Sequence, residues 1–177
     1  ENALSTSSRT IRSRLRSSAP SSIPSSTLSI VPARLTHVGP IANAMRSMDV
    51  MECAAFGRTP RQGLRTGLLN SEEPLTALVD GRPVAMFGCV VVSAIDGIGS
   101  PWFLGTDEVY RHGREMLVWG RYFVDRIVDS TPDVRNLVSV FNVKAIRLLR
   151  AWGFNVGSET TLIGGVPFYP FWIKRDV

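Results

Sequence analysis

The chain alternates between stretches that are apolar at every second residue and stretches that are apolar at every third or fourth residue. The first pattern predicts β-strands and the second predicts amphipathic helices. Their order predicts a mixed α/β fold, with helices packed on both faces of one sheet. The expected strands are Leu28–Pro32, Leu75–Val79, Val84–Ser93, Pro101–Leu104, Leu137–Phe141 and Phe168–Ile173.

Five helical segments are expected between these strands. Their predicted positions are a start at Gly39-Pro40, then Asp49 to Gly57, Thr59-Pro60 to about Leu69, Arg111–Asp129 and Val143–Trp152. The long helix carries an apolar stripe that includes Trp119 and Phe123, and the last helix is apolar around Ile146 and Trp152. We expect these four side chains to be buried where the two helices meet the sheet.

Local signals place several helix ends and one hairpin. Thr59 with Gln62 forms a capping-box pattern, and Asn142 and Gly153 are typical of the two ends of the last helix. Asp49 and Glu52 have the same capping spacing, so we expect Glu52 to cap a helix rather than to act in catalysis. Asp80-Gly81 between two apolar runs predicts a β-hairpin.

Composition excludes several classes of protein. No run of 18 apolar residues occurs, so no transmembrane helix is expected. The two cysteines, Cys53 and Cys89, and the two histidines, His37 and His112, lack the spacing of metal ligands. No metal site or disulfide scaffold is therefore expected, and both cysteines are interpreted as small core residues in a reducing compartment.

The basic charge is concentrated at the start of the chain. Residues 1–29 contain eleven serines, four arginines and one acid, Glu1, so they carry +3 of the total charge of +5. Such a segment cannot bury enough apolar surface to fold by itself. We therefore expect two parts, a Ser/Arg/Pro-rich extended arm at 1–27 and a folded domain at 28–177. Because the chain opens at Glu1 and not at methionine, we expect it to be processed, engineered or incomplete.

Three interpretations of the arm remain open. It could be a solvated linker, an organelle-targeting peptide, or a binding arm that becomes ordered on a partner. The third interpretation is favoured, and it assigns partner binding to Arg9, Arg12, Arg14 and Arg16. The partner would be a protein of a larger assembly, or nucleic acid contacted through its phosphates.

The order of elements, together with Asn142, Ala145, Gly153 and Phe154, resembles the GNAT acetyltransferase fold over residues 28–177. The stretch from Trp102 to Arg111 is more closely similar to small GNAT-like virion proteins of short-tailed phages. This second resemblance implies a virion location, with host cytoplasm during assembly, and other virion proteins as partners in a multi-copy assembly.

The GNAT resemblance implies an acetyl-CoA site at the start of the long helix, where backbone N–H groups hold the pyrophosphate. The residues assigned to this cofactor site are Arg111, His112, Gly113, Arg114 and Asn142, with His112 expected to be an exposed loop residue. Glu115 stands where the family has a second small residue. Leu149 stands where the family has a proton-donating tyrosine, so no catalytic residue is assigned.

Two functions are therefore expected. The first is a phage virion structural protein, or an internal protein ejected with the genome, built on a catalytically inactive GNAT fold. It would have no cofactor and would dock through its arm. The alternative is an acetyl-CoA-dependent N-acetyltransferase with a divergent pyrophosphate loop. Whether the chain is an enzyme is left open, with the inactive form favoured.

Overall fold

A computed structural model describes residues 27–175 of the chain. The arginines assigned to partner binding, Arg9, Arg12, Arg14 and Arg16, lie outside the described residues. The helices are α1 (Leu35–Asn43), α2 (Ser47–Ala55), α3 (Pro60–Asn70), α4 (Gly113–Ser130) and α5 (Val143–Ala151), with a 3-10 helix at Asp107–His112. The strands are β1 (Leu28–Pro32), β2 (Leu75–Val79), β3 (Arg82–Ser93), β4 (Ile98–Gly105), β5 (Asp133–Ser139), β6 (Asn155–Val156), β7 (Thr161–Ile163) and β8 (Val166–Lys174).

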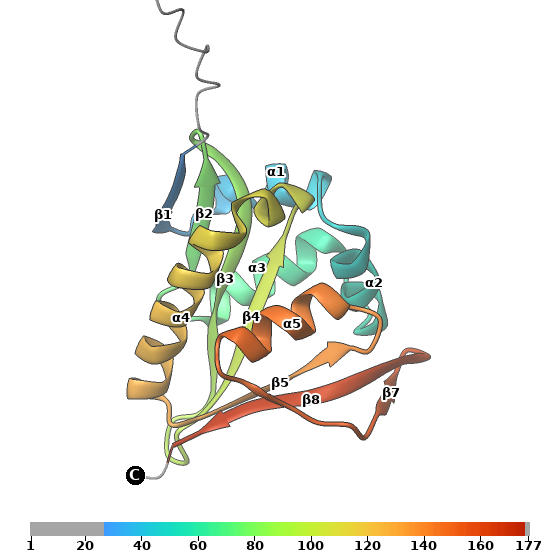
Figure 1. The fold of residues 1–177 in the computed structure, drawn as a ribbon. Helices are drawn as coiled ribbons and strands as arrows, with labels where there is room; N and C mark the ends of the chain where they lie inside the picture. The colour runs from blue at the N-terminus through green and yellow to red at the C-terminus, as the bar shows by residue number, and fades with distance from the viewer. Residues whose placement is uncertain (1–26, 176–177) are drawn as a thin grey trace, which may run out of the picture.

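All the strands belong to one sheet, in the order β1-β2-β3-β4-β5-β8-β6, with β7 paired to β8. Every pairing is antiparallel except that of β4 with β5, which is parallel. Helices α4 and α5 cover one face of the sheet, and α3 lies behind the other (Figure 1). The mixed sheet with helices on both faces that the sequence predicts is therefore confirmed.

The parallel pair β4–β5 is joined only at its beginning. Cα partners are Ile98 with Asp133 and Gly99 with Val134, although the two strands continue to Gly105 and Ser139. Beyond this point Asn136 of β5 reaches across, and its side-chain amide donates to the carbonyl of Pro101 at 2.8 Å. The two strands therefore separate toward their carboxyl ends and leave an opening in the middle of the sheet.

The faces of the sheet carry two separate hydrophobic clusters. On one face, Phe103 and the buried Val134 and Val138 of the sheet pack with residues of α4 and α5. On the other, Met86 of β3 packs with α1 and α3, and Trp102 and Leu104 of β4 join it. Successive residues of β4 thus alternate between the two clusters, as the pleat of a strand requires.

Helix α4 is fixed to α5 by Trp152. The indole N–H of Trp152 donates to the carbonyl of Met116 at 3.1 Å. A Cβ atom on Gly120 would lie only 1.9 Å from the same indole ring, so glycine is the residue that lets the ring lie against α4. Phe123, Ile146 and Trp152 are buried as predicted. Trp119 was predicted to be buried and is not; 38% of its surface is exposed, because it lies at the edge of the apolar stripe.

Two helices begin earlier than the sequence predicts. Helix α1 starts at Leu35 and contains Pro40 in its interior, because His37 Nδ1 accepts a hydrogen bond from the Arg34 N–H and caps the helix there. Helix α2 starts at Ser47, so Asp49 lies in its first turn and Glu52 in its middle. The capping box at Thr59 and Gln62 and the Asp80-Gly81 hairpin turn are confirmed. None of the described helices is long and apolar enough to cross a membrane.

Candidate active site

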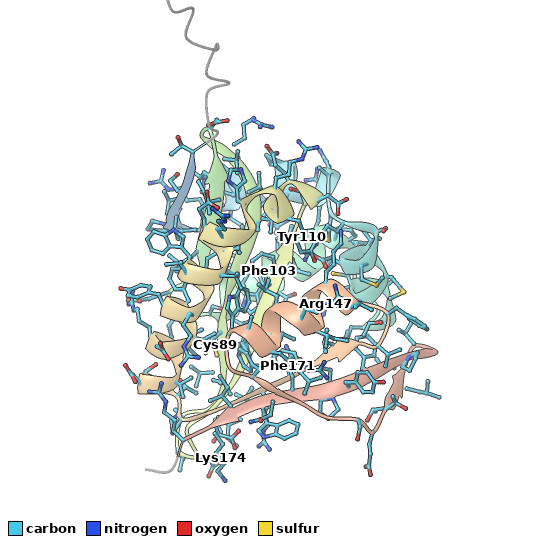
Figure 2. The ribbon with its side chains drawn as sticks, in the orientation of Figure 1. Cys89, Phe103, Tyr110, Arg147, Phe171 and Lys174 are labelled. Carbon is cyan, nitrogen blue, oxygen red and sulfur yellow. The ribbon has the colours of Figure 1, made fainter. Side chains whose placement is uncertain are left out.

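A cavity of about 420 Å³ occupies the opening between β4 and β5. It is bounded by residues of both sheet faces, since Trp102 and Leu104 on one side and Phe103 and Phe123 on the other all line it. Phe103 lies on β4, and Tyr110 lies in the 3-10 helix that follows that strand; both are labelled in Figure 2. Volumes of this order are typical of small-molecule sites.

Helix α2 closes the end of the opening by binding to the end of β4. Asp49 Oδ2 accepts from the Gly105 N–H at 2.9 Å and from the Arg46 guanidinium at 2.6 Å, and Oδ1 accepts from the same guanidinium at 2.8 Å. Burial raises the pKa of Asp49, and Arg46 and the Gly105 amide oppose the rise. The side chains of Asp49 and Arg46 are both almost completely buried. Both carboxylate oxygens of Asp49 are therefore occupied by hydrogen bonds from Arg46 and Gly105.

One helical turn further along, Glu52 binds to the end of β5. Its Oε1 accepts from the Ser139 N–H at 3.0 Å and from the side-chain amide of Asn142 at 3.1 Å. Burial is the largest influence on Glu52 and raises its pKa, while these two hydrogen bonds oppose the rise. The prediction that Glu52 caps a helix is therefore wrong: the earlier start of α2 turns this side chain toward the sheet.

Arg46, Asp49 and Glu52, with their partners Gly105 and Ser139, form what we call the α2 junction. Two carboxylates three residues apart connect one helix to the ends of two diverging strands. A carboxylate with a raised pKa that lines a cavity is a candidate for proton transfer. Within the junction, Glu52 is that candidate, because Asp49 already has a buried counter-ion.

Asn142 lies beside Glu52, and both the oxygen and the nitrogen of its side-chain amide form hydrogen bonds. Its oxygen accepts from the Ala145 N–H at 3.3 Å, which confirms the predicted cap of α5. Its nitrogen donates to Glu52. Asn142 also lines the cavity, so the structure brings this candidate cofactor residue to the site, and its role toward a cofactor stays a prediction.

The four other candidate cofactor residues surround the N-terminus of α4. Arg111, Gly113 and Arg114 are exposed, and a Cβ atom on Gly113 would meet no other atom within 4 Å. His112 was predicted to be exposed and is instead buried, with 5% of its surface accessible. Its Nδ1 lies 3.7 Å from the carboxylate of Glu115, which is itself half-exposed.

Tyr110 is a cavity residue that sequence reasoning missed. Two cations pack on its ring, with the Arg46 guanidinium carbon 4.9 Å and the Lys144 nitrogen 4.7 Å from the ring centre. Burial raises the pKa of its hydroxyl, so the phenol remains protonated at neutral pH. Tyr110 and Leu149 line the same cavity, and Tyr110 is the one tyrosine among the described lining residues. Its place directly before Arg111, in the segment that resembles the GNAT cofactor loop, was the available signal.

The two cysteines are protonated thiols. Burial raises the pKa of Cys53 and of Cys89 to about 11. Cys53 is buried, as predicted for a core residue, and Cys89 is half-buried. Within residues 27–175, no group of three or more histidine, cysteine, aspartate or glutamate side chains could hold a metal ion.

No protein-family model matches this sequence, and no curated protein matches it either. Solved structures do match the fold. A spermidine N-acetyltransferase SpeG chimera from Vibrio cholerae and hSSAT has a TM-score of 0.61 at 14% identity, over 83% of this chain and 95% of that one. The aminoglycoside acetyltransferase AAC(6')-Ib in complex with coenzyme A has a TM-score of 0.59 at 16% identity, over 84% and 95%.

A third match carries the name of the fold family. The acetyltransferase of the GNAT family from Streptococcus pneumoniae has a TM-score of 0.52 at 11% identity, over 82% of this chain and 98% of that one. The chain therefore has the GNAT acetyltransferase fold that its sequence resembles. At these identities, the likeness concerns the fold alone.

Proposed function

We propose that this chain is a coenzyme A-dependent N-acyltransferase that acts in the cavity between β4 and β5. The observation that carries the proposal is the opening of the parallel pair after two Cα partners, with a cavity of about 420 Å³ in it and Glu52 at its end. Residues of both sheet faces line this cavity, so two substrates could meet in it from opposite faces. Solved structures of the same fold were determined with coenzyme A, which supports this choice.

The residues around α4 are compatible with an acyl-CoA diphosphate. The space beside Gly113 is open, and Arg111 and Arg114, which flank it in the sequence, are exposed. Helix N-termini favour anions. The half-exposed Glu115 carboxylate is oriented toward His112. When bound, acyl-CoA supplies the acyl thioester, whose C–S bond breaks as the new amide bond forms.

Two side chains of the cavity can move the protons that this exchange requires. Glu52 accepts a proton from the acceptor amine, and its raised pKa brings it nearer to neutral pH, where a general base is most effective. Tyr110 donates a proton toward the leaving sulfur, which Leu149 cannot do. Both assignments use residues that line the same cavity.

The test is acetyl transfer from acetyl-CoA to a panel of amines, followed by mass spectrometry of the products. Glu52→Gln keeps an acceptor oxygen for Ser139 and Asn142 but cannot take a proton, so kcat/KM should fall by about 10²- to 10⁴-fold. Glu159→Gln, at an exposed position outside the cavity, is the matched control and should change nothing. Full activity in Glu52→Gln, or no transfer to any amine by the wild-type chain, would contradict the proposal.

The virion role, with other virion proteins or nucleic acid as partners, remains a prediction from the sequence. The fold and the cavity support the transferase better. The arm that would dock the chain, with Arg9, Arg12, Arg14 and Arg16, lies outside residues 27–175. Deleting residues 1–27 and measuring incorporation into particles would test that prediction separately.

A further inference from the structure

The face of the cavity toward α2 and α3, which we call the acceptor wall, is largely apolar. Trp102 and Leu104 contribute from β4, and Phe56, directly after α2, packs edge-on against Phe168 of β8 with ring centres 5.4 Å apart. The indole N–H of Trp102 donates to the Ser71 hydroxyl at 2.8 Å. Because this hydrogen bond satisfies the one polar group of the indole, the ring contributes apolar surface to the cavity. This wall can bind the apolar body of a substrate.

The charges of the cavity are few and cancel. Among the described lining residues, the charged side chains are Arg46, Asp49, Glu52 and Arg58, two cations and two anions, which sum to zero. Asp49 is bound on both oxygens by Arg46 and also by the Gly105 N–H. Glu52 forms no salt bridge with any described residue, and its Oε1 is held by two neutral N–H donors. The cavity therefore offers one carboxylate to a cationic substrate.

Building on the proposed transferase function, we propose that the acceptor is a small molecule with a single primary amine on an apolar or aromatic body. Its ammonium group lies against Glu52, and its body lies on the acceptor wall. In the transfer, the ammonium and the thioester become an amide and a thiol, with one proton released to Glu52. The acceptor must be small, because the cavity of about 420 Å³ also has to admit the thioester arm.

This acceptor differs from the ligands of solved structures of the same fold, which were determined with spermine and with kanamycin. Those molecules carry several amines. In this cavity, each ammonium beyond the first would lie against aromatic rings or near the guanidinium of Arg58. A buried charge without a partner is costly, so polyamines and aminoglycosides should bind poorly.

The experiment measures amine binding to the full chain without acetyl-CoA, by titration calorimetry. 2-Phenylethylamine should bind at least about tenfold more tightly than spermidine or kanamycin, and Glu52→Gln should weaken it by about tenfold or more. Thr66→Glu adds a second carboxylate without a salt-bridge partner to the cavity, because Thr66 is a half-buried lining residue of α3. It should improve spermidine binding relative to 2-phenylethylamine, whereas the matched Thr66→Gln should not.

The outcomes distinguish this inference from the proposed function. Tighter binding of spermidine or kanamycin, or no binding of 2-phenylethylamine, overturns the inference. If acetyl transfer also occurs and prefers spermidine, the transferase stands and the inference fails. If 2-phenylethylamine binds in a Glu52-dependent way but is never acetylated, the inference about the cavity stands and the transferase fails.

Discussion

The α2 junction and the N-terminus of α4 both lie beyond the carboxyl ends of the parallel strands, but their polar groups are used differently. In the junction, Asp49 and Glu52 are held by backbone N–H groups and by buried side chains. At α4, Arg111, Gly113 and Arg114 are exposed, and the space at Gly113 is open. The hydrogen bonds of the α2 junction thus hold the ends of the two separated strands in place. At the N-terminus of α4, the side chains of Arg111 and Arg114 and the space at Gly113 are accessible to a ligand.

This difference separates stability from binding in the two regions. Junction substitutions that remove a hydrogen-bonding group should destabilise the domain strongly, because they leave buried polar groups without partners. Changes at the α4 terminus should be nearly neutral for stability and should act on ligand affinity.

The largest effect is expected from Asp49→Ala. The substitution leaves the Arg46 guanidinium buried without its counter-ion and the Gly105 N–H without an acceptor. Breaking one side of a buried pair should lower the free energy of unfolding by about 3–5 kcal/mol. Urea unfolding of the wild type and the variant measures this change in the free energy of unfolding. Glu73→Ala removes the exposed pair with Arg126 and should cost less than about 1 kcal/mol. Equal losses in the two variants would refute the special status of the junction.

The packing of Trp152 against Gly120, in the middle of α4, should contribute more to stability than the exposed edge of the helix at Trp119. Trp152→Ala removes the ring that lies against Gly120 and the hydrogen bond to Met116, at an expected cost of about 3–5 kcal/mol in denaturant melts. Trp119→Ala should cost no more than about 2 kcal/mol, because more than a third of that side chain is already in water. The reverse order of losses would show that the exposed edge of α4, and not Trp152, stabilises it.

Glu52 should give the junction a pH dependence. Its pKa is raised by burial above its ordinary value of 4.5, so the folded state holds this proton more tightly than the unfolded state does. The contribution of Glu52 to the free energy of unfolding therefore falls as pH rises from 4.5 through the raised pKa. Glu52→Gln should flatten that fall, and Glu159→Gln should leave it unchanged. Urea melts across this range check it; identical profiles for Glu52→Gln and wild type would contradict the assignment.

The smallest effect is expected at Glu115. This carboxylate is half-exposed in the first turn of α4 and lies 3.7 Å from His112. Glu115→Gln removes the charge without adding helix-breaking glycine, so the free energy of unfolding should change by less than about 1 kcal/mol. A loss above about 2 kcal/mol in the same melts would place Glu115 among the residues that stabilise the fold, as in the junction.

The sequence predicts those parts of the fold that depend on neighbouring residues. The hairpin at Asp80-Gly81, the capping box at Thr59 and the Asn142 cap depend on partners within a few residues, and all three are confirmed. Glu52 has the same local spacing from Asp49 but bonds to Ser139 and Asn142, 87 and 90 residues away. The local sequence pattern does not distinguish a side chain that caps its own helix, as at Thr59, from one that binds a distant strand, as Glu52 does.

The residues of the candidate site also fall into those that the local sequence predicts and those that depend on distant contacts. Arg111, Gly113 and Arg114 are adjacent in the chain, so a resemblance to one loop was enough to place them together. Tyr110 lines the cavity together with residues from distant parts of the chain, and Arg46 and Lys144, the two cations that pack on its ring, also come from two other parts of the chain. The burial of His112 and the exposure of Trp119 depend equally on how α4 lies on the sheet.

The most direct test of the central claim is a titration of the full chain with acetyl-CoA, using two substitutions of Gly113. This residue has a φ of −57°, so its backbone tolerates any side chain, and the space beside it is open. Gly113→Ala keeps the site, whereas Gly113→Glu places a carboxylate where the helix N-terminus would hold the diphosphate. Such a carboxylate suits a helix N-terminus, so the fold should remain intact.

The account predicts weak but saturable binding for the wild type, with a Kd of about 100 μM, because the loop lacks a second small residue. Gly113→Ala should remain within about twofold of that value, and Gly113→Glu should bind at least about tenfold more weakly. No saturable binding by the wild type at about 1 mM, or equal affinity in all three proteins, would contradict an acyl-CoA site at this end of the cavity.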